Sequence, residues 1–176
     1  MPQAGKHRAV FLVGFMGAGK TSVGRSLGHR LGWSFEDLDD RIQASAGRSI
    51  ADIFRDLGEV EFRRLESAAL SELLSELSAR PRVVALGGGA FAQPENAGLL
   101  ESAGVHVVFL DGPAEELFRR CQKEQRERPL LQDVTRFRRL YEERKSSYLR
   151  ASFRVDTTGK DVEQVAVEVA CKIGLG

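Results

Sequence analysis

The sequence is poor in cysteine, carries almost no net charge and contains no long apolar run. Its two cysteines, Cys121 and Cys171, lie far apart and form no CxxC pair or Cys/His cluster, so neither a disulfide framework nor a structural zinc site is indicated. The 26 basic and 25 acidic residues leave a formal charge of +1, so any anion site must be local. No apolar run approaches the roughly 18 residues of a membrane-spanning helix. We therefore expect neither nucleic acid nor a membrane as a partner.

The remaining composition is that of a globular protein. Apolar residues make up 42% and charged residues 29% of 176 residues, which excludes a disordered chain and predicts a single domain over residues 1–176. Lys6, His7 and Arg8 precede an apolar stretch, as in a signal peptide, but this stretch is glycine-rich and has no A-x-A-like cleavage site. We therefore expect a cytoplasmic protein.

Short apolar runs alternate along the chain with longer stretches of helical periodicity. The runs expected to be strands are 9–14, 33–38, 82–86, 105–110 and 152–156. Helices are expected at 21–31, 114–121, 134–149 and 162–173, and around the apolar positions Phe62, Leu65, Ala69, Leu73 and Leu77. Strands separated by helices predict an α/β fold, in which a parallel sheet is covered by helices on both faces.

The clearest motif lies between the first strand and the first helix. Residues 14–21 read GFMGAGKT and fit G-x-x-x-x-G-K-[ST]. The glycines allow backbone N–H groups to turn inward onto phosphate oxygens, and the helix presents its positive end to the same anion. Lys20 should reach the β- and γ-phosphates, and the Thr21 hydroxyl should ligate Mg²⁺. A ligand-free glycine turn would not require Lys and Thr in these places, so the motif predicts ATP or GTP binding.

Two other classes of nucleotide-binding protein fit less well. A GTPase needs a base-reading N-K-x-D, which does not occur, and the D-x-x-G match at 156–159 lies too near the C-terminus. A motor or helicase usually has a longer chain and an acidic pair closing a strand, whereas only Asp111 follows Leu110. A small-molecule kinase remains the favoured class.

Asp37 and Asp39 follow the second expected strand. A spacing of two at the end of a strand places both carboxylates on the same side, where one can hold Mg²⁺ through water and the other a substrate hydroxyl. The alternative is that Asp39 only caps the following helix.

Arg63 and the glycine run 87–89 are further candidates. Arg63 lies beside the apolar helix face, where its guanidinium could fork onto a carboxylate or merely form a surface salt bridge. Three consecutive glycines cost conformational entropy, so something must approach the backbone closely there.

The segment 122–128 (QKEQRER) is almost wholly polar and precedes Pro129. It is either a solvated helix end or a lid that carries an arginine toward the nucleotide. The second interpretation gains weight from the phosphate-binding motif, because phosphoryl transfer requires exclusion of water.

Several short motifs occur in the order and spacing found in shikimate kinases: GFMGAGKTSVGR at 14–25, DLD at 37–39, SIADIF at 49–54, GEVEFRRLE at 58–66, LGGGA at 86–90, RPLL at 128–131 and RKSSY at 144–148. The sequence resembles that family over nearly its full length. The resemblance implies a P-loop kinase with the nucleoside-monophosphate-kinase-like three-layer α/β/α fold and a five-stranded parallel sheet of order 2-3-1-4-5. The implied reaction transfers the γ-phosphoryl group of ATP to the 3-hydroxyl of shikimate, in chorismate and aromatic amino-acid biosynthesis.

The resemblance also assigns residue roles. Nucleotide binding falls to Gly17, Ala18, Gly19, Lys20, Thr21, Ser22, Arg120 and Arg128, with Arg120 stacking on adenine. Thr21 and Asp37 would hold one Mg²⁺ per subunit. The shikimate site comprises Asp39, Arg63, Gly87, Gly88, Gly89 and Arg144. The implied catalytic residues are Lys20, Asp39 and Arg128, with Asp39 the candidate base.

The implied organisation is a core with a substrate-binding region at about 38–66 and a lid at about 121–133, and we expect a monomer. Two alternatives are another small-metabolite P-loop kinase, similar to gluconate kinase, and a nucleotide-binding regulatory module that has lost catalysis. Gluconate kinase has no need for the combination of DLD, FRR and GGG. A module without catalysis should have lost Asp37, Asp39 or Arg128, and all three are present.

Overall fold

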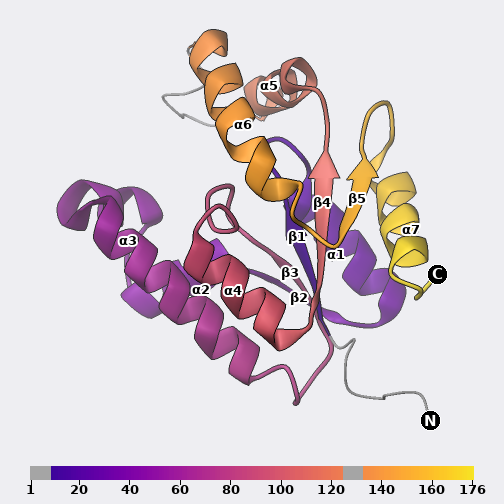
Figure 1. The fold of residues 1–176 in the computed structure, drawn as a ribbon, viewed down its shortest axis with the longest axis horizontal. Helices are drawn as coiled ribbons and strands as arrows, with labels where there is room; N and C mark the ends of the chain where they lie inside the picture. Colours follow the sequence, from indigo (N-terminus) through magenta and orange to yellow (C-terminus); the bar gives the residue numbers. More distant parts are fainter. Residues whose placement is uncertain (1–8, 125–132) are drawn as a thin grey trace.

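Five parallel strands form the centre of the molecule (Figure 1), which the computed structural model describes over residues 9–124 and 133–176. The strands are β1 (Ala9–Val13), β2 (Ser34–Asp37), β3 (Arg82–Ala85), β4 (His106–Asp111) and β5 (Phe153–Asp156). Their order is β2-β3-β1-β4-β5, and every neighbouring pair is parallel. The predicted fold class and strand order 2-3-1-4-5 are confirmed.

The middle of the sheet is the core of the protein. All residues of β1 and β3 are buried, as are all but the first of β4. This burial explains why these strands read as continuous apolar runs in the sequence, since a parallel sheet is covered on both faces. β2 is an edge strand and is only partly buried, which explains its weaker, more polar signal.

The helices are α1 (Lys20–Leu31), α2 (Leu38–Ala46), α3 (Ile50–Ser75), α4 (Pro94–Ala103), α5 (Ala114–Lys123), α6 (Val134–Tyr148) and α7 (Val162–Lys172). Figure 1 shows α1 and α7 on one side of the sheet and α3 and α4 on the other. The apolar periodicity did not predict α4, a short helix that begins at Pro94 and ends before Gly104. None of the helices in the described part of the chain has the length and apolar character needed to cross a bilayer.

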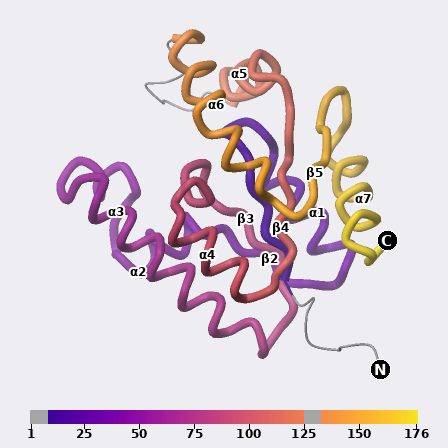
Figure 2. Tube along the Cα trace, viewed as in Figure 1, coloured from indigo at the N-terminus to yellow at the C-terminus, as the bar shows by residue number. Residues whose placement is uncertain are grey.

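Helix α3 is broken near its start. Gly58 has φ 82° and ψ 172°, which are not helical angles, and it separates Ile50–Leu57 from the longer part of the helix. A positive φ with an extended ψ is available essentially to glycine alone. The break lets the chain change direction before Arg63, and Figure 2 shows the turn between α2 and α3 projecting away from the sheet.

Candidate active site

The loop between β1 and α1 forms a cradle of backbone amides. Gly17 has φ 83°, and a Cβ there would lie 2.5 Å from the carbonyl oxygen of Leu117, so only glycine fits this turn. Gly19 is the N-cap of α1 in a left-handed conformation and supplies no side-chain cap to the helix. The first turn of α1 also contains no acidic residue. The start of this helix is therefore suited to a bound anion.

Lys20 lies across this loop. Its Nζ donates hydrogen bonds to the carbonyl oxygens of Gly14, at 2.6 Å, and Phe15, at 3.2 Å. The ammonium group is thus held at the mouth of the cradle. There it can exchange a carbonyl oxygen for a phosphate oxygen by a small side-chain rotation.

Thr21 and Asp37 bring two oxygen donors together beside Lys20. The Thr21 hydroxyl donates to Asp37 Oδ2 at 3.1 Å, and Asp37 Oδ1 accepts from the amide of Asp39 at 2.9 Å. Asp37, rather than Asp39, is therefore the N-cap of α2. The side chain of Asp39 takes no part in that cap, so the capping alternative fails for this residue.

The same pair fits Mg²⁺. A hydroxyl and a carboxylate are hard oxygen donors, and Mg²⁺ in kinases uses one or two such groups together with water and phosphate oxygens. In residues 9–124 and 133–176 there is no cluster of three or more His, Cys, Asp or Glu that could hold a metal. The arrangement suits a metal that arrives with the nucleotide.

One cavity of about 230 Å³ joins the phosphate loop to the acidic pair and the glycine run. Asp39 reaches across it, because a Cβ on Gly87 would lie 2.9 Å from Asp39 Oδ1. Its lining residues are Met16, Gly17, Gly19, Lys20, Thr21, Ser22, Arg25, Asp37, Asp39, Leu86, Gly87, Gly88, Cys121 and Glu124. The cavity brings together the predicted phosphate, metal and substrate groups.

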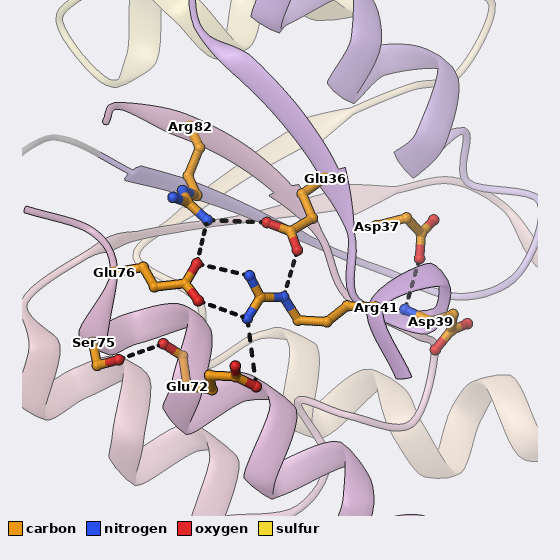
Figure 3. Close-up of polar contacts among 8 residues, drawn as sticks. All are labelled: Glu36, Asp37, Asp39, Arg41, Glu72, Ser75, Glu76 and Arg82. Carbon is orange, nitrogen blue, oxygen red and sulfur yellow. Dashed lines mark hydrogen bonds and ion pairs between the residues drawn. The ribbon is translucent and has the colours of Figure 1, made fainter. Parts of the chain in front are cut away.

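An ion-pair network stabilises the junction of β2 and α2, where Asp37 and Asp39 lie (Figure 3). Arg41, on α2, donates to Glu36 Oε1 at 2.5 Å and to Glu76 Oε2 at 2.7 Å. Arg82, on β3, donates to Glu36 Oε2 at 3.0 Å. The network ties α2 to β2, β3 and the end of α3, which fixes the start of α2 where Asp39 projects into the cavity.

Two arginines lie against the glycine run. A Cβ on Gly89 would come within 2.6 Å of Arg63 Nη2, and one on Gly88 within 3.4 Å of Arg144 Nη1. Arg144 comes from α6 and lies over the ring of Phe15, 5.8 Å from its centroid. The two guanidinium groups come from α3 and α6 and reach the same loop, which suits them to bind one carboxylate together.

Glu66 holds Arg63 from behind. Arg63 Nη1 donates to Glu66 Oε1 at 2.7 Å, and Glu66 is only 1% exposed. Burial raises the pKa of the Glu66 carboxyl above its ordinary value, while the ion pair with Arg63 opposes that rise. The sequence pattern did not identify Glu66, although its i+3 spacing from Arg63 on one helix is the available signal.

Arg120 lies on the other side of the phosphate loop. It lines a second cavity of about 410 Å³, which also includes Gly17, Thr157 and Lys160. Its guanidinium donates to the carbonyl oxygens of Gly17 and Thr157, each at 3.4 Å, and to Glu116 at 2.5 Å. This open space adjoins the phosphate loop.

The lid prediction falls mostly on residues that the structure does not describe. Arg128 lies outside the described residues, as do 125–132 as a whole. Helix α5 ends at Lys123 and α6 begins at Val134, so these helices flank the predicted lid. Arg25, which also lines the first cavity, was missed by the motif, although it lies one helical turn beyond Thr21 on the same face.

Comparisons with known proteins point to one family. The family model described as shikimate kinase matches residues 16–173. The shikimate kinase of Geobacter metallireducens is 47% identical over 165 residues, which cover 92% of this chain and 89% of that protein. The shikimate kinase of Persephonella marina is 40% identical over 167 residues, with coverages of 94% and 99%. The structure of shikimate kinase from Acinetobacter baumannii in complex with shikimate has a TM-score of 0.84 and 37% identity, covering 94% of this chain and 92% of that one. This chain belongs to the shikimate kinase family.

Proposed function

We propose that the protein, as a shikimate kinase, transfers the γ-phosphoryl group of ATP to the 3-hydroxyl of shikimate across the cavity between loop 14–19 and the glycine run 87–89. The observation that carries this assignment is the single cavity shared by Lys20, Asp37, Asp39 and Gly88. A phosphate cradle and a carboxylate that faces a second loop are the two parts that such a transfer needs.

The nucleotide occupies the cradle side in this proposal. The amides of residues 17–21 and Ser22 surround the phosphates, and Lys20 leaves the carbonyl of Gly14 for the β- and γ-phosphate oxygens. Thr21 and Asp37 hold one Mg²⁺ per subunit, which neutralises charge on the β- and γ-phosphates when bound. Arg120 packs against adenine in the cavity beside Thr157.

Shikimate occupies the glycine side. Its carboxylate calls for a guanidinium clamp, which Arg63 and Arg144 supply together with the amides of Gly88 and Gly89. Its hydroxyls call for an acceptor, and Asp39 is the carboxylate that faces Gly87. The clamp and the acceptor approach the same loop, so a ring acid bound between them would direct a hydroxyl toward the phosphate cradle.

Asp39 has the catalytic position in this arrangement. It accepts a hydrogen bond from the attacking hydroxyl and orients it in line with the γ-phosphorus, and it can take the proton as the new P–O bond forms. Lys20 stabilises charge that builds on the transferred group. We assign Arg128 the same role from the opposite side on the basis of its sequence motif.

A coupled ADP-release assay tests the proposal. Purified protein is given ATP and Mg²⁺ with shikimate, with gluconate or with neither. We expect ADP release with shikimate only, and ³¹P NMR of the product should show a phosphomonoester on the 3-oxygen. ADP release with gluconate but not with shikimate would favour the other small-metabolite kinase. No ADP release in any of the three reactions would favour the regulatory module.

We also propose a monomer that works in the cytoplasm, since the cavity of this one chain already holds the proposed phosphate, metal and substrate groups together and the apolar stretch after Arg8 lacks the A-x-A-like cleavage site of an export signal. Size-exclusion chromatography with light scattering, with and without ATP and shikimate, measures the mass directly. A dimer that dissociates into inactive monomers would contradict this part of the proposal.

A further inference from the structure

We propose that Tyr148 is a positioning residue for the shikimate end of the site. Its hydroxyl donates a hydrogen bond to the carbonyl oxygen of Gly88, and this bond sets the direction in which the amide of Gly89 points. The inference rests on the proposed assignment of Gly88 and Gly89 to the substrate carboxylate, and the test below separates the two.

Tyr148 is placed rigidly for this purpose. It is the last residue of α6, it is completely buried, and its ring packs against Phe109 with the centroids 5.2 Å apart. Burial raises the pKa of its hydroxyl to about 12, although Arg144 and Arg63 act in the opposite direction. The phenol is therefore protonated, and remains a donor, near neutral pH.

The planar peptide bond transmits this contact to the substrate side. The carbonyl of Gly88 and the N–H of Gly89 belong to one trans peptide unit, so they point in opposite directions. When Tyr148 holds the carbonyl toward α6, the N–H of Gly89 must point away from α6. Three consecutive glycines leave this peptide free to rotate in the absence of an anchor.

The amides themselves are available. Within the described part of the chain, no backbone carbonyl accepts a hydrogen bond from the N–H of Gly88 or Gly89, whereas Ala90 N–H donates to Gly87. Gly89 is buried and Gly88 is half-buried. Buried amides are normally paired, so the amide of Gly89, beside a pair of arginines, is ready for an anionic ligand. An anchored loop presents it in a fixed direction, which reduces the ordering needed when the ligand binds.

Helix α6 thus contributes twice to the same end of the site. Arg144 lies four residues before Tyr148, on the same helix face, and its Nη1 is 3.4 Å from the position that a Cβ on Gly88 would take. Arg144 contacts the substrate in the proposed function. Tyr148 does not contact the substrate itself: it holds the loop, and its hydroxyl also interacts with the Arg144 guanidinium.

The test compares Tyr148→Phe with Tyr141→Phe. Tyr141 is a matched control, because it is also buried on α6 and also donates to a glycine carbonyl, that of Gly112 at 2.9 Å. Both variants remove one oxygen and keep the ring. For each enzyme, kcat and KM are measured with shikimate and with its methyl ester, which lacks the carboxylate charge, below the unfolding temperature of both variants.

We expect Tyr148→Phe to raise KM for shikimate about three- to tenfold, with KM for ATP changed less than about twofold. The preference for shikimate over the ester, as a ratio of kcat/KM values, should fall about three- to tenfold. Tyr141→Phe should leave that preference unchanged. A merely structural role for Tyr148 would lower kcat/KM for shikimate and for its ester equally and keep the ratio, which would overturn the inference.

The wild-type ratio separates the inference from the proposed function. If the wild type prefers shikimate strongly and Tyr148→Phe keeps that preference, only the role of Tyr148 is wrong. If the wild type uses shikimate but does not distinguish it from its ester, the assignment of the substrate carboxylate to Gly88 and Gly89 is wrong, and the inference about Tyr148 is wrong with it.

Discussion

Replacement of Arg63 by alanine should damage both substrate binding and stability, for different reasons. A charge-assisted hydrogen bond to a carboxylate contributes about 1.5–3 kcal/mol, so we expect kcat/KM for shikimate to fall about 10- to 100-fold while KM for ATP changes little. The same change leaves Glu66, which is 1% exposed, without its 2.7 Å partner. Breaking a buried ion pair on one side typically destabilises a protein by about 3–5 kcal/mol.

The stability loss should depend on pH in a defined direction. Burial already raises the pKa of Glu66, and Arg63 is the main group that opposes this rise. Without Arg63 the folded-state pKa rises further, so the variant is least impaired below the ordinary glutamate value of 4.5, where the carboxyl is protonated in both states. The loss in free energy of unfolding relative to the wild type grows as the pH rises through the folded-state pKa of Glu66.

The double variant Arg63→Ala/Glu66→Gln separates the two effects. Glutamine carries no charge, so the double variant should regain much of the lost stability and lose the pH dependence, while its defect toward shikimate persists. Arg64→Ala is the matched control, because Arg64 is an exposed neighbour that pairs with Glu61, and it should change neither property. Chemical denaturation between pH 4 and 8 and steady-state kinetics provide the measurements. Equal losses for both substrates, or a double variant that recovers shikimate use, would refute the reasoning.

Three further variants test other parts of the site. Lys20→Met should fold with an unchanged circular dichroism spectrum but turn over at least about 100-fold more slowly; near-normal turnover would reject its role. Arg120→Ala should raise KM for ATP several-fold and leave KM for shikimate unaffected, which initial rates at varied ATP will check. Glu76→Gln should lower Tm at neutral pH, because Arg41 holds the pKa of Glu76 below its usual range. The difference in Tm from the wild type should narrow on acidification, because the stability that the ion pair provides is lost as the carboxylate is protonated. Thermal scans across acidic and neutral pH would contradict this if the gap stayed constant.

The fold could be predicted closely where the sequence pattern has one physical cause. β1, β3 and β4 are buried on both faces, so their apolar runs have no competing interpretation. Helix α4 was missed because Pro94–Ala103 has little amphipathic contrast: Asn96 is buried beside Ala97 and Leu100. Its amide donates to the carbonyl of Ala90, and its oxygen accepts from Ser67. A buried polar residue of this kind satisfies tertiary partners that no local pattern specifies.

Site residues could be predicted from the sequence where they lie within one short motif. Residues 14–19 form the loop that leads into α1, so the motif itself puts Lys20 and Thr21 at the start of that helix. Glu66 and Tyr148 were not identified, because each acts on a group brought close by the tertiary fold. Tyr148 meets Gly88 across 60 positions of sequence, and only the packing of α6 over the sheet brings them together.

The glycine run 87–89 shows what the sequence could not predict: which groups lie against its backbone. Three consecutive glycines indicate that something lies against the backbone, and a ligand is the simplest candidate. The structure places three charged side chains there instead: Asp39 at Gly87, Arg144 at Gly88 and Arg63 at Gly89. A Cβ at Gly87 or Gly89 would overlap the Asp39 or Arg63 side chain, with approaches of 2.9 and 2.6 Å, whereas a Cβ at Gly88 would only contact Arg144 at 3.4 Å. Gly87 and Gly89 are therefore needed before any substrate binds, because the lack of a Cβ there lets a carboxylate and a guanidinium lie against the same loop.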